Sequence, residues 1–424
     1  MNTQAFISDS NTYHEFLDSI YRVEQGQQAK FSMHSSITPA ILDEKEANGF
    51  INRYEIIQQY LKISEKIFKD SLFDNSHSRI RDLILNEVNP DFSVSYHREL
   101  YSKKTSTPYF FRTDESVPGK ISEIQYGGSL WGMVDVLQQS LEVLSTLVDI
   151  PIRSFNQVKI TEIFAEIIKD LTNNDPLIFH QIDESSNMLD MNLFISLSRK
   201  YGLKYLGRDY DVSLNNVNFI RTHSFLEEVT NSNFIGFLEK YHKGTLLFDI
   251  FPSVLFFQKL PLMLPFWEET KNYYPDSVRD IFPFSSLVGD DDVILESGAH
   301  LTIDEFVRLK AGERNYYLKY AGMNGNINWG AKSVYQLSNS SVQCKKLLQT
   351  AAEQFRRGQY WIIQKAYHKK ESVSYVSEDS VVTKPMYTKY SGFYGPKGFM
   401  GGHVMTRSFY KVHGQNEGVC RLIL

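Results

Sequence analysis

The stretch from residue 110 to residue 125 contains the side chains best suited to chemistry, in the order Phe-Phe-Arg-Thr-Asp-Glu-Ser-Val-Pro-Gly-Lys-Ile-Ser-Glu-Ile-Gln. Its Pro-Gly pair at 118–119 is typical of a tight turn, which predicts a hairpin with one strand over 111–114 and a returning strand over 120–125. Successive side chains of a strand point to opposite faces, so alternate residues share a face. Polar side chains from both strands are therefore expected on one surface: Arg112, Asp114, Glu123 and Gln125.

Those residue types are suited to two different roles. Two carboxylates and an amide oxygen are hard ligands of the kind that Mg²⁺ prefers, and Mg²⁺ commonly takes its remaining ligands from water and substrate phosphates. An arginine beside them can hold a phosphate or a carboxylate through two parallel hydrogen bonds. The plainer interpretation is the solvent face of an ordinary hairpin with a surface salt bridge. Spacing alone leaves both interpretations open.

The order Arg-x-Asp, turn, Lys-Ile-x-Glu-x-Gln resembles the magnesium-binding hairpin of the glutathionylspermidine synthase-like ATP-grasp amide ligases. The resemblance implies that Asp114, Glu123 and Gln125 hold magnesium. It also implies that Arg112 contacts the transferred phosphate or the intermediate. Gln125 stands where that family usually has asparagine, which keeps the amide oxygen but moves it one methylene outward.

Two later segments follow in the order that this family leads one to expect. Residues 251–267 resemble its segment in which a lysine precedes an apolar stretch with Pro and Trp, although by itself this is a core segment. Residues 317–326, Tyr-Leu-Lys-Tyr-Ala-Gly-Met-Asn-Gly-Asn, look like the strand lysine and the glycine-rich phosphate loop. Lys319 would then neutralise phosphate charge, and Gly322 and Gly325 would let backbone N–H groups approach it.

The phosphate loop departs from the family pattern. Tyr320 stands where the family has proline, and Met323-Asn324 stands where it has Arg-Glu. Two glycines after a strand are a weak signal, and Lys319 taken alone is more typical of a surface lysine that lays its stem over apolar neighbours. The catalytic details of this loop therefore stay open.

The remaining predicted contacts lie near the end of the chain. Residues 358–367 resemble the adenine-side strand and hinge of ATP-grasp enzymes, which implies adenine contacts from Gln364 and from the backbone of Lys365 and Ala366. An ordinary buried strand that ends at the surface would look the same. The last strands also resemble those of the family, which implies that Arg407 faces the transferred phosphate.

Apolar periodicity indicates the elements that must position these residues. Spacings of three and four predict helices over 52–72, 130–148, 160–171, 188–201 and 341–355. Short apolar runs bounded by turn residues predict strands over 177–182, 203–206, 316–318 and 360–364, with further strands in 381–424. The order strand, helix, strand across 177–206 predicts a βαβ unit with a parallel sheet.

The fold class is therefore expected to be mixed α+β, and the resemblance implies an ATP-grasp-like fold with a βαβ pre-ATP-grasp-type lobe. The expected division is an N-terminal helical region over 1–95, a metal-binding hairpin and βαβ substrate lobe over 96–300, and a nucleotide-binding lobe over 301–424.

Composition excludes several classes of protein. With 424 residues, 42% of them hydrophobic and 22% charged, the chain can bury large cores and is not a disordered or fibrous sequence. A net charge of −5 gives no general basic field, so neither nucleic acid nor membrane is an expected partner. The two cysteines, Cys344 and Cys420, cannot build a disulfide framework, and the histidine spacing predicts no zinc site. No signal peptide or spanning segment is expected, which favours a cytoplasmic protein.

The resemblance implies an ATP- and Mg²⁺-dependent ligase that joins a small-molecule or peptide carboxylate to an amine through an acyl phosphate. No protein nucleophile is needed, and Ser129 is interpreted as the N-cap of a helix. Two alternatives stay open. The acceptor could be a carrier-protein thiol, or the chain could be a catalytically inactive ATP-grasp-like binding or scaffold protein.

Overall fold

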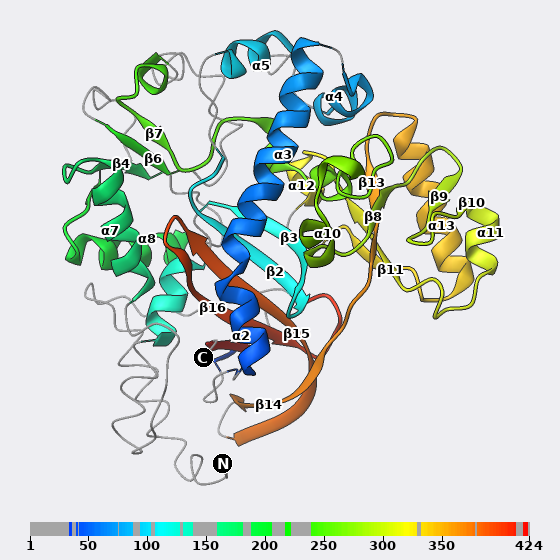
Figure 1. Ribbon diagram of the computed structural model, residues 1–424. Helices are drawn as coiled ribbons and strands as arrows, with labels where there is room; N and C mark the ends of the chain where they lie inside the picture. Colours follow the sequence, from blue (N-terminus) through cyan, green and yellow to red (C-terminus); the bar gives the residue numbers. More distant parts are fainter. Residues whose placement is uncertain are drawn as a thin grey trace.

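The computed structural model describes residues 34–35, 40, 42–74, 76–87, 94–102, 107–127, 130–138, 159–180, 188–205, 217–221, 239–328, 332–377, 380–412 and 419–422. Within these residues the chain contains both helices and strands, and the strands form one seven-stranded, two four-stranded and one two-stranded sheet. The mixed α+β class predicted from the sequence is therefore confirmed. Figure 1 shows the largest sheet in the middle of the molecule, with the two four-stranded sheets on either side of it.

The central sheet joins the hairpin to the C-terminal part of the chain. Its strands run in the order β1-β17-β16-β15-β2-β3, and β14 pairs with β15. Their bounds are β1 (His34–Ser35), β2 (Phe111–Val117), β3 (Lys120–Tyr126), β14 (Lys370–Ser377), β15 (Ser380–Gly395), β16 (Gly398–Arg407) and β17 (Val419–Leu422). The predicted hairpin is confirmed as β2 and β3, and β15 lies antiparallel beside β2.

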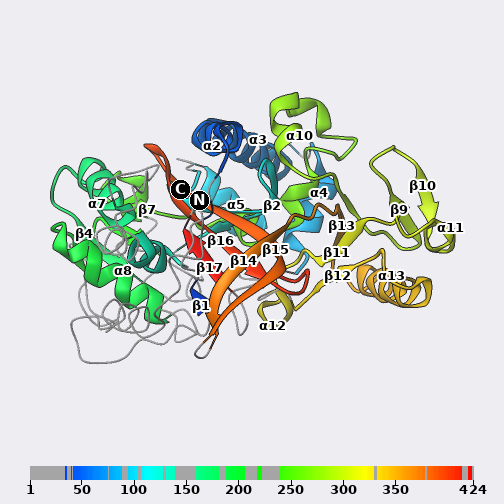
Figure 2. The ribbon, with the colours of Figure 1, turned by 90° about the horizontal axis from the view of Figure 1, so that it is seen from below.

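An N-terminal group of helices covers one face of this sheet (Figures 1 and 2). The group consists of α2 (Glu44–Ile51), α3 (Arg53–Phe73), α4 (Ser78–Leu85) and α5 (Val94–Tyr101). The helix predicted over 52–72 is α3, and its apolar face is buried through side chains such as Ile57, Leu61 and Phe68. The buried ion pair between Arg53 and Glu115 fastens α3 to β2.

The predicted βαβ unit is confirmed in the parallel sheet, whose strand order is β5-β4-β6-β7. Its elements are α7 (Ile160–Leu171), β4 (Leu177–His180), α8 (Met188–Lys200), β5 (Lys204–Tyr205), β6 (Phe219–Arg221) and β7 (Leu247–Phe248). The helix predicted over 130–148 is observed over 131–138, and its remainder lies outside the described residues, as do Ser129 and the strand ends predicted at 181–182 and 206.

The other four-stranded sheet carries the predicted strand lysine and runs in the order β12-β11-β13-β8. Its elements and those around it are η4 (Val254–Phe257), η5 (Leu260–Met263), η6 (Lys271–Tyr273), α10 (Asp276–Ile281), β8 (Ser285–Leu287), β9 (Asp292–Ile294), β10 (His300–Thr302), α11 (Ile303–Arg308), β11 (Tyr316–Tyr320), α12 (Gly325–Asn328), β12 (Val334–Gln336), α13 (Ser341–Phe355) and β13 (Trp361–Lys365). The helix predicted over 341–355 is confirmed as α13.

Separate apolar clusters support these parts. One lies under α3 and around η4 and η5, a second under α7 and α8, and a third between α13 and the sheet of β11 and β13. The hairpin reaches into the first two clusters, through Phe111 and Ile121 in one and, from the residue before β2, Phe110 in the other. Across the described part of the chain, no helix is long and apolar enough to cross a membrane.

Candidate functional site

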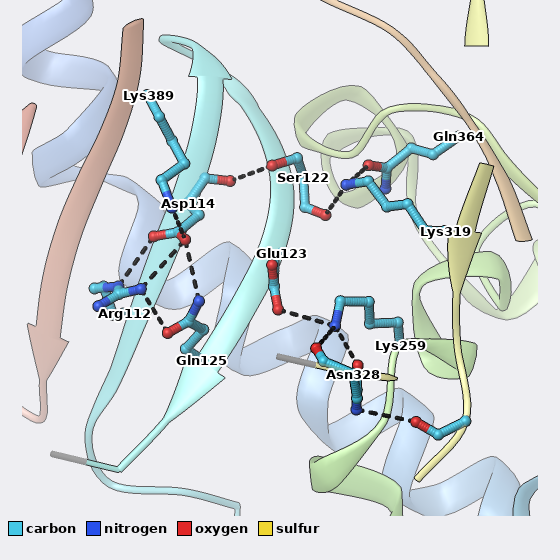
Figure 3. Close-up of polar contacts among 11 residues, drawn as sticks. Arg112, Asp114, Ser122, Glu123, Gln125, Lys259, Lys319, Asn328, Gln364 and Lys389 are labelled. Carbon is cyan, nitrogen blue, oxygen red and sulfur yellow. Dashed lines mark hydrogen bonds and ion pairs between the residues drawn. The ribbon is translucent and has the colours of Figure 1, made fainter. Parts of the chain in front are cut away.

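The hairpin presents its polar residues as the sequence predicts. In the antiparallel register of β2 and β3, Arg112 lies opposite Gln125 and Asp114 lies opposite Glu123. Directly opposed residues of an antiparallel pair point to the same face, so all four side chains share one face of the hairpin. Figure 3 shows this face, with β15 on one side and the β11 region on the other.

Asp114 is the centre of a dense hydrogen-bond network on this face. Its side chain is 1% exposed and accepts from Arg112 Nε at 3.0 Å and Nη2 at 3.2 Å. It also accepts from Lys389 Nζ at 2.7 Å and Gln125 Nε2 at 3.1 Å (Figure 3). A further hydrogen bond comes from Ser391 Oγ at 2.9 Å. Burial alone would raise the pKa of Asp114, but Arg112 and Lys389 hold it well below its usual range. Asp114 is therefore an ionised carboxylate between two cations.

The second carboxylate of the face pairs with a lysine from another part of the chain. Glu123 Oε1 lies 3.2 Å from Lys259 Nζ, and Lys259 precedes η5 in the segment that resembles the family's lysine-containing stretch. Lys259 Nζ also donates to Asn328 Oδ1 at 2.6 Å, and Asn328 Nδ2 donates to the carbonyl of Gly322 at 3.0 Å. A single chain of contacts thus connects β3 to the glycine-containing loop.

Lys319 on β11 reaches the same face from the opposite side. It is 6% exposed, and Nζ donates to the backbone carbonyl of Ser122 at 3.2 Å and to Gln364 Oε1 at 2.6 Å. Burial is the main cause that lowers the pKa of Lys319 to about 8, with the carboxylate of Glu123 opposing it and the ammonium group of Lys259 adding to it. Lys319 is therefore a buried cation placed beside the hairpin, and it is not the surface lysine of the plainer interpretation.

The predicted phosphate loop is filled by a carboxylate from the N-terminal helices. Glu87, just after α4, accepts through Oε2 from the hydroxyl of Tyr320 at 2.6 Å and from the N–H of Met323 at 2.8 Å. A Cβ at Gly322 would lie 1.5 Å from that oxygen, so the glycine is required for this close approach. Gly325 begins the short helix α12. A backbone N–H of the loop therefore does bind an anionic group, and in this structure that group is Glu87.

The residues expected beside adenine are already engaged with the protein. The side chain of Gln364 is buried and donates to Ser285 Oγ at 3.2 Å while accepting from Lys319. The N–H of Lys365 donates to the carbonyl of Phe284 at 2.8 Å, and the N–H of Ala366 donates to that of Asn315 at 3.0 Å. Gln364 thus lies next to the hairpin face and supports Lys319.

Arg407 is not brought into the Asp114 network. It ends β16 opposite Tyr387, whereas Ser391, which contacts Asp114, lies opposite His403. Arg407 Nη1 donates to the carbonyl of Lys411 at 3.4 Å. The residue of β16 level with the network is therefore His403, which is buried, and burial lowers its pKa to about 3, so this imidazole is neutral.

Whether a magnesium ion fits this site depends on which oxygen atoms of these residues are not already engaged. Both carboxylate oxygens of Asp114 accept hydrogen bonds from cationic or neutral donors, and Gln125 Oε1 accepts from Arg112 Nη2. Glu123 is paired with Lys259. Among the residues that the structure describes, no three His, Cys, Asp or Glu side chains come together as a metal cluster. As arranged here, Asp114, Glu123 and Gln125 do not fit a magnesium ion, because ammonium and guanidinium groups occupy the positions a metal would need.

Sequence reasoning missed several residues of this site. Lys389 and Ser391 alternate on β15 and point to Asp114, but only the pairing of β15 with β2 makes that spacing meaningful. Lys259 lies within residues 251–267, whose apolar composition by itself indicates only a core segment. Glu87 had no signal at all, because its contact with the loop joins residues 236 positions apart.

Comparisons with known proteins establish the fold. No protein-family model matches the chain, and no curated protein matches it. The solved structure of a glutathione synthetase-like effector (GSS30) from Globodera pallida in its apo form matches with a TM-score of 0.61 at 10% sequence identity, covering 100% of this chain and 97% of that one. The likeness is one of fold, and it confirms the predicted fold class: mixed α+β and ATP-grasp-like.

Proposed function

We propose that this chain is an ATP-grasp ligase that joins a carboxylate to an amine through an acyl phosphate. The observation that carries the proposal is the convergence of cationic side chains from separate elements on the face of the hairpin. The set consists of Arg112 from β2, Lys259 before η5, Lys319 from β11 and Lys389 from β15. Phosphoryl transfer depends on fixed positive charge around the moving group, so a cluster of this kind suits the phosphates of ATP.

The chemistry requires positions and charges rather than a protein nucleophile. A substrate carboxylate oxygen attacks the γ-phosphorus of ATP, ADP leaves, and the product is an acyl phosphate. An amine then attacks the acyl carbon, the C–N bond forms and inorganic phosphate leaves. Arg112 and Lys319 would stabilise the charge on the transferred group. The substrates expected are a small-molecule or peptide carboxylate and an amine, with a carrier-protein thiol as the alternative acceptor.

A second candidate function is a binding protein that holds a phosphate-bearing ligand without turnover. Two observations favour it. The carboxylate of Asp114 is fully engaged within the protein, and Glu87 accepts the hydrogen bond that the backbone N–H of Met323 donates in the glycine-containing loop. A ligase of this class would have to move both groups to complete its nucleotide site.

Release of ADP separates the two candidates. The protein would be incubated with ATP and a panel of carboxylate and amine pairs, in excess MgCl₂ and in excess EDTA, with the thermal midpoint measured alongside. A ligand at about 100 times its dissociation constant adds roughly 2.7 kcal/mol to stability, which gives a measurable shift. Lys319→Met is the site variant. The matched control is Lys384→Met, because Lys384 is an exposed lysine near the start of β15.

A ligase predicts ADP release that needs both substrates, that Lys319→Met abolishes and that Lys384→Met keeps. A thermal shift with ATP but no ADP with any pair would select the binding protein. The absence of both a shift and ADP would remove the nucleotide from the proposal altogether.

A further inference from the structure

Cationic side chains gather on the hairpin face, and they indicate the class of ligand. Arg112, Lys259, Lys319 and Lys389 converge there from separate elements, with the carboxylates of Asp114 and Glu123 among them. This surface is largely buried. A buried surface rich in cations is suited to a ligand that brings negative charge with it.

Lys319 is the clearest case of a buried cation whose direct hydrogen-bond acceptors are neutral. Its side chain is buried, and the acceptors it reaches are neutral oxygens, the carbonyl of Ser122 and the amide of Gln364. Within the described ranges it forms no ion pair. Lys389, by contrast, is 23% exposed on its side chain, and one of its ammonium donors goes to Asp114. An ammonium group has three N–H donors, so Lys389 has donors besides the one that Asp114 accepts.

Lys389 also occupies a lone pair of the Asp114 carboxylate that a metal ion would need. Its Nζ lies 2.7 Å from Oδ2 of Asp114, and Arg112 takes both oxygens of the same carboxylate. A divalent cation at Asp114 would have to displace an ammonium group that is already paired there. The positive charge that magnesium would deliver to a phosphate is supplied here by side chains of the chain itself.

We propose that this face binds the oligophosphate of its ligand without a divalent metal, with the ammonium group of Lys389, held by Asp114, in the place of the ion. The inference rests on the proposed function for the identity of the ligand as a nucleoside triphosphate. What the inference adds is that phosphate binding needs no metal ion and that the ammonium group of Lys389 takes the place of that ion. Recognition of the phosphates then depends on Lys389, Lys319 and Arg112 together.

The test is isothermal titration calorimetry with two probes, ATP and inorganic pyrophosphate, each in excess EDTA and in excess MgCl₂. The native protein is expected to bind with the same affinity in both conditions. Lys389→Met keeps the apolar stem and removes the charge, so affinity in EDTA is expected to fall about tenfold or more. Lys389→Arg should keep metal-free binding, and Lys384→Met on the same strand should leave it unchanged.

Mn²⁺ binding, followed by electron paramagnetic resonance without any nucleotide, provides an independent readout. The native protein is expected to leave Mn²⁺ free. A bound Mn²⁺ that Asp114→Asn abolishes would overturn the inference, as would binding of both probes only in the presence of MgCl₂, and that second result would leave the proposed ligase standing.

Binding of pyrophosphate but not ATP, equal in EDTA and MgCl₂, would support the metal-free site and count against the proposed nucleotide. Failure of both probes to bind in either condition would overturn the inference and the nucleotide assignment together. The thermal midpoint of each variant, measured without ligand, shows whether lost binding comes from lost folding.

Discussion

At the scale of a single residue, Lys319 connects the electrostatics of the site to pH. Burial lowers its pKa to about 8, so above that pH the free protein has largely lost this charge. Because the unfolded chain keeps its lysine protonated to about pH 10.4, the unfolded state binds more protons in that window and stability rises with pH through it. An anionic ligand prefers the charged lysine and therefore opposes this loss.

The first prediction follows from that linkage. Binding of ATP just above pH 8 is expected to be accompanied by proton uptake, and affinity should fall as the pH rises further. Titration calorimetry in two buffers of different ionisation enthalpy measures the uptake directly. Lys319→Arg is the control, because a guanidinium stays charged and should bind without this uptake. Equal uptake by the native protein and Lys319→Arg would contradict the assignment.

At the scale of helices and strands, the sequence predicts elements that depend on local patterns but not the partners that those elements meet. Helices such as α3, α7 and α13, and the hairpin, follow from local periodicity and a turn, so their existence was predictable. The partners of the hairpin were not. Asp114 meets Lys389 across 275 positions of sequence, and only the pairing of β2 with β15 brings them together. The same long-range pairing changes a set of apparent metal ligands into a network satisfied by cations.

The loop after β11 depends in the same way on a distant helix. Gly322 and Glu87 form a matched pair in which the glycine makes room for a carboxylate, and the carboxylate fastens the loop through Tyr320 and Met323. Gly322→Ala would place a Cβ 1.5 Å from Glu87 Oε2 and force the carboxylate out. Hydrogen bonds to a charged group would be lost, so a loss of about 1–3 kcal/mol of stability is expected.

A double-mutant cycle measures the coupling between Gly322 and Glu87. Glu87→Ala removes the group that the new Cβ would meet most closely and leaves the hydroxyl of Tyr320 at 2.7 Å, so Gly322→Ala should cost less stability in that background. Urea unfolding of the native protein, both single variants and the double variant gives the coupling. Simple additivity of the two single changes would show that Glu87 is not what restricts the glycine.

At the scale of the whole molecule, the site depends on parts that fold around different apolar clusters. The parallel sheet is joined to the hairpin through Asp249, just after β7, whose carbonyl accepts from the N–H of Tyr109 at 3.0 Å. The side chain of Asp249 lies 3.0 Å from Nη1 of Arg221, and both are fully buried. The guanidinium carbon of Arg221 lies 4.7–5.7 Å from the ring centroids of Phe110, Trp131, Phe164 and Phe194.

Because Phe110 directly precedes β2, this buried pair supports the entry to the hairpin as well as the parallel sheet. Asp249→Asn would remove the carboxylate that pairs with the buried guanidinium of Arg221, and cation–π contacts do not replace it. A loss of about 3–5 kcal/mol is expected. Replacing both partners, as Arg221→Met with Asp249→Leu, removes the charges together and should cost less than Asp249→Asn alone.

Scanning calorimetry measures the stabilities, and hydrogen exchange shows which elements respond. In Asp249→Asn, the amides of β2 and β3 should lose protection together with those of α7 and α8, since Arg221 packs between these parts. Lost protection confined to the parallel sheet would mean that the two parts unfold independently. In that case the geometry of the hairpin face would be set by β15, α3 and the hairpin alone.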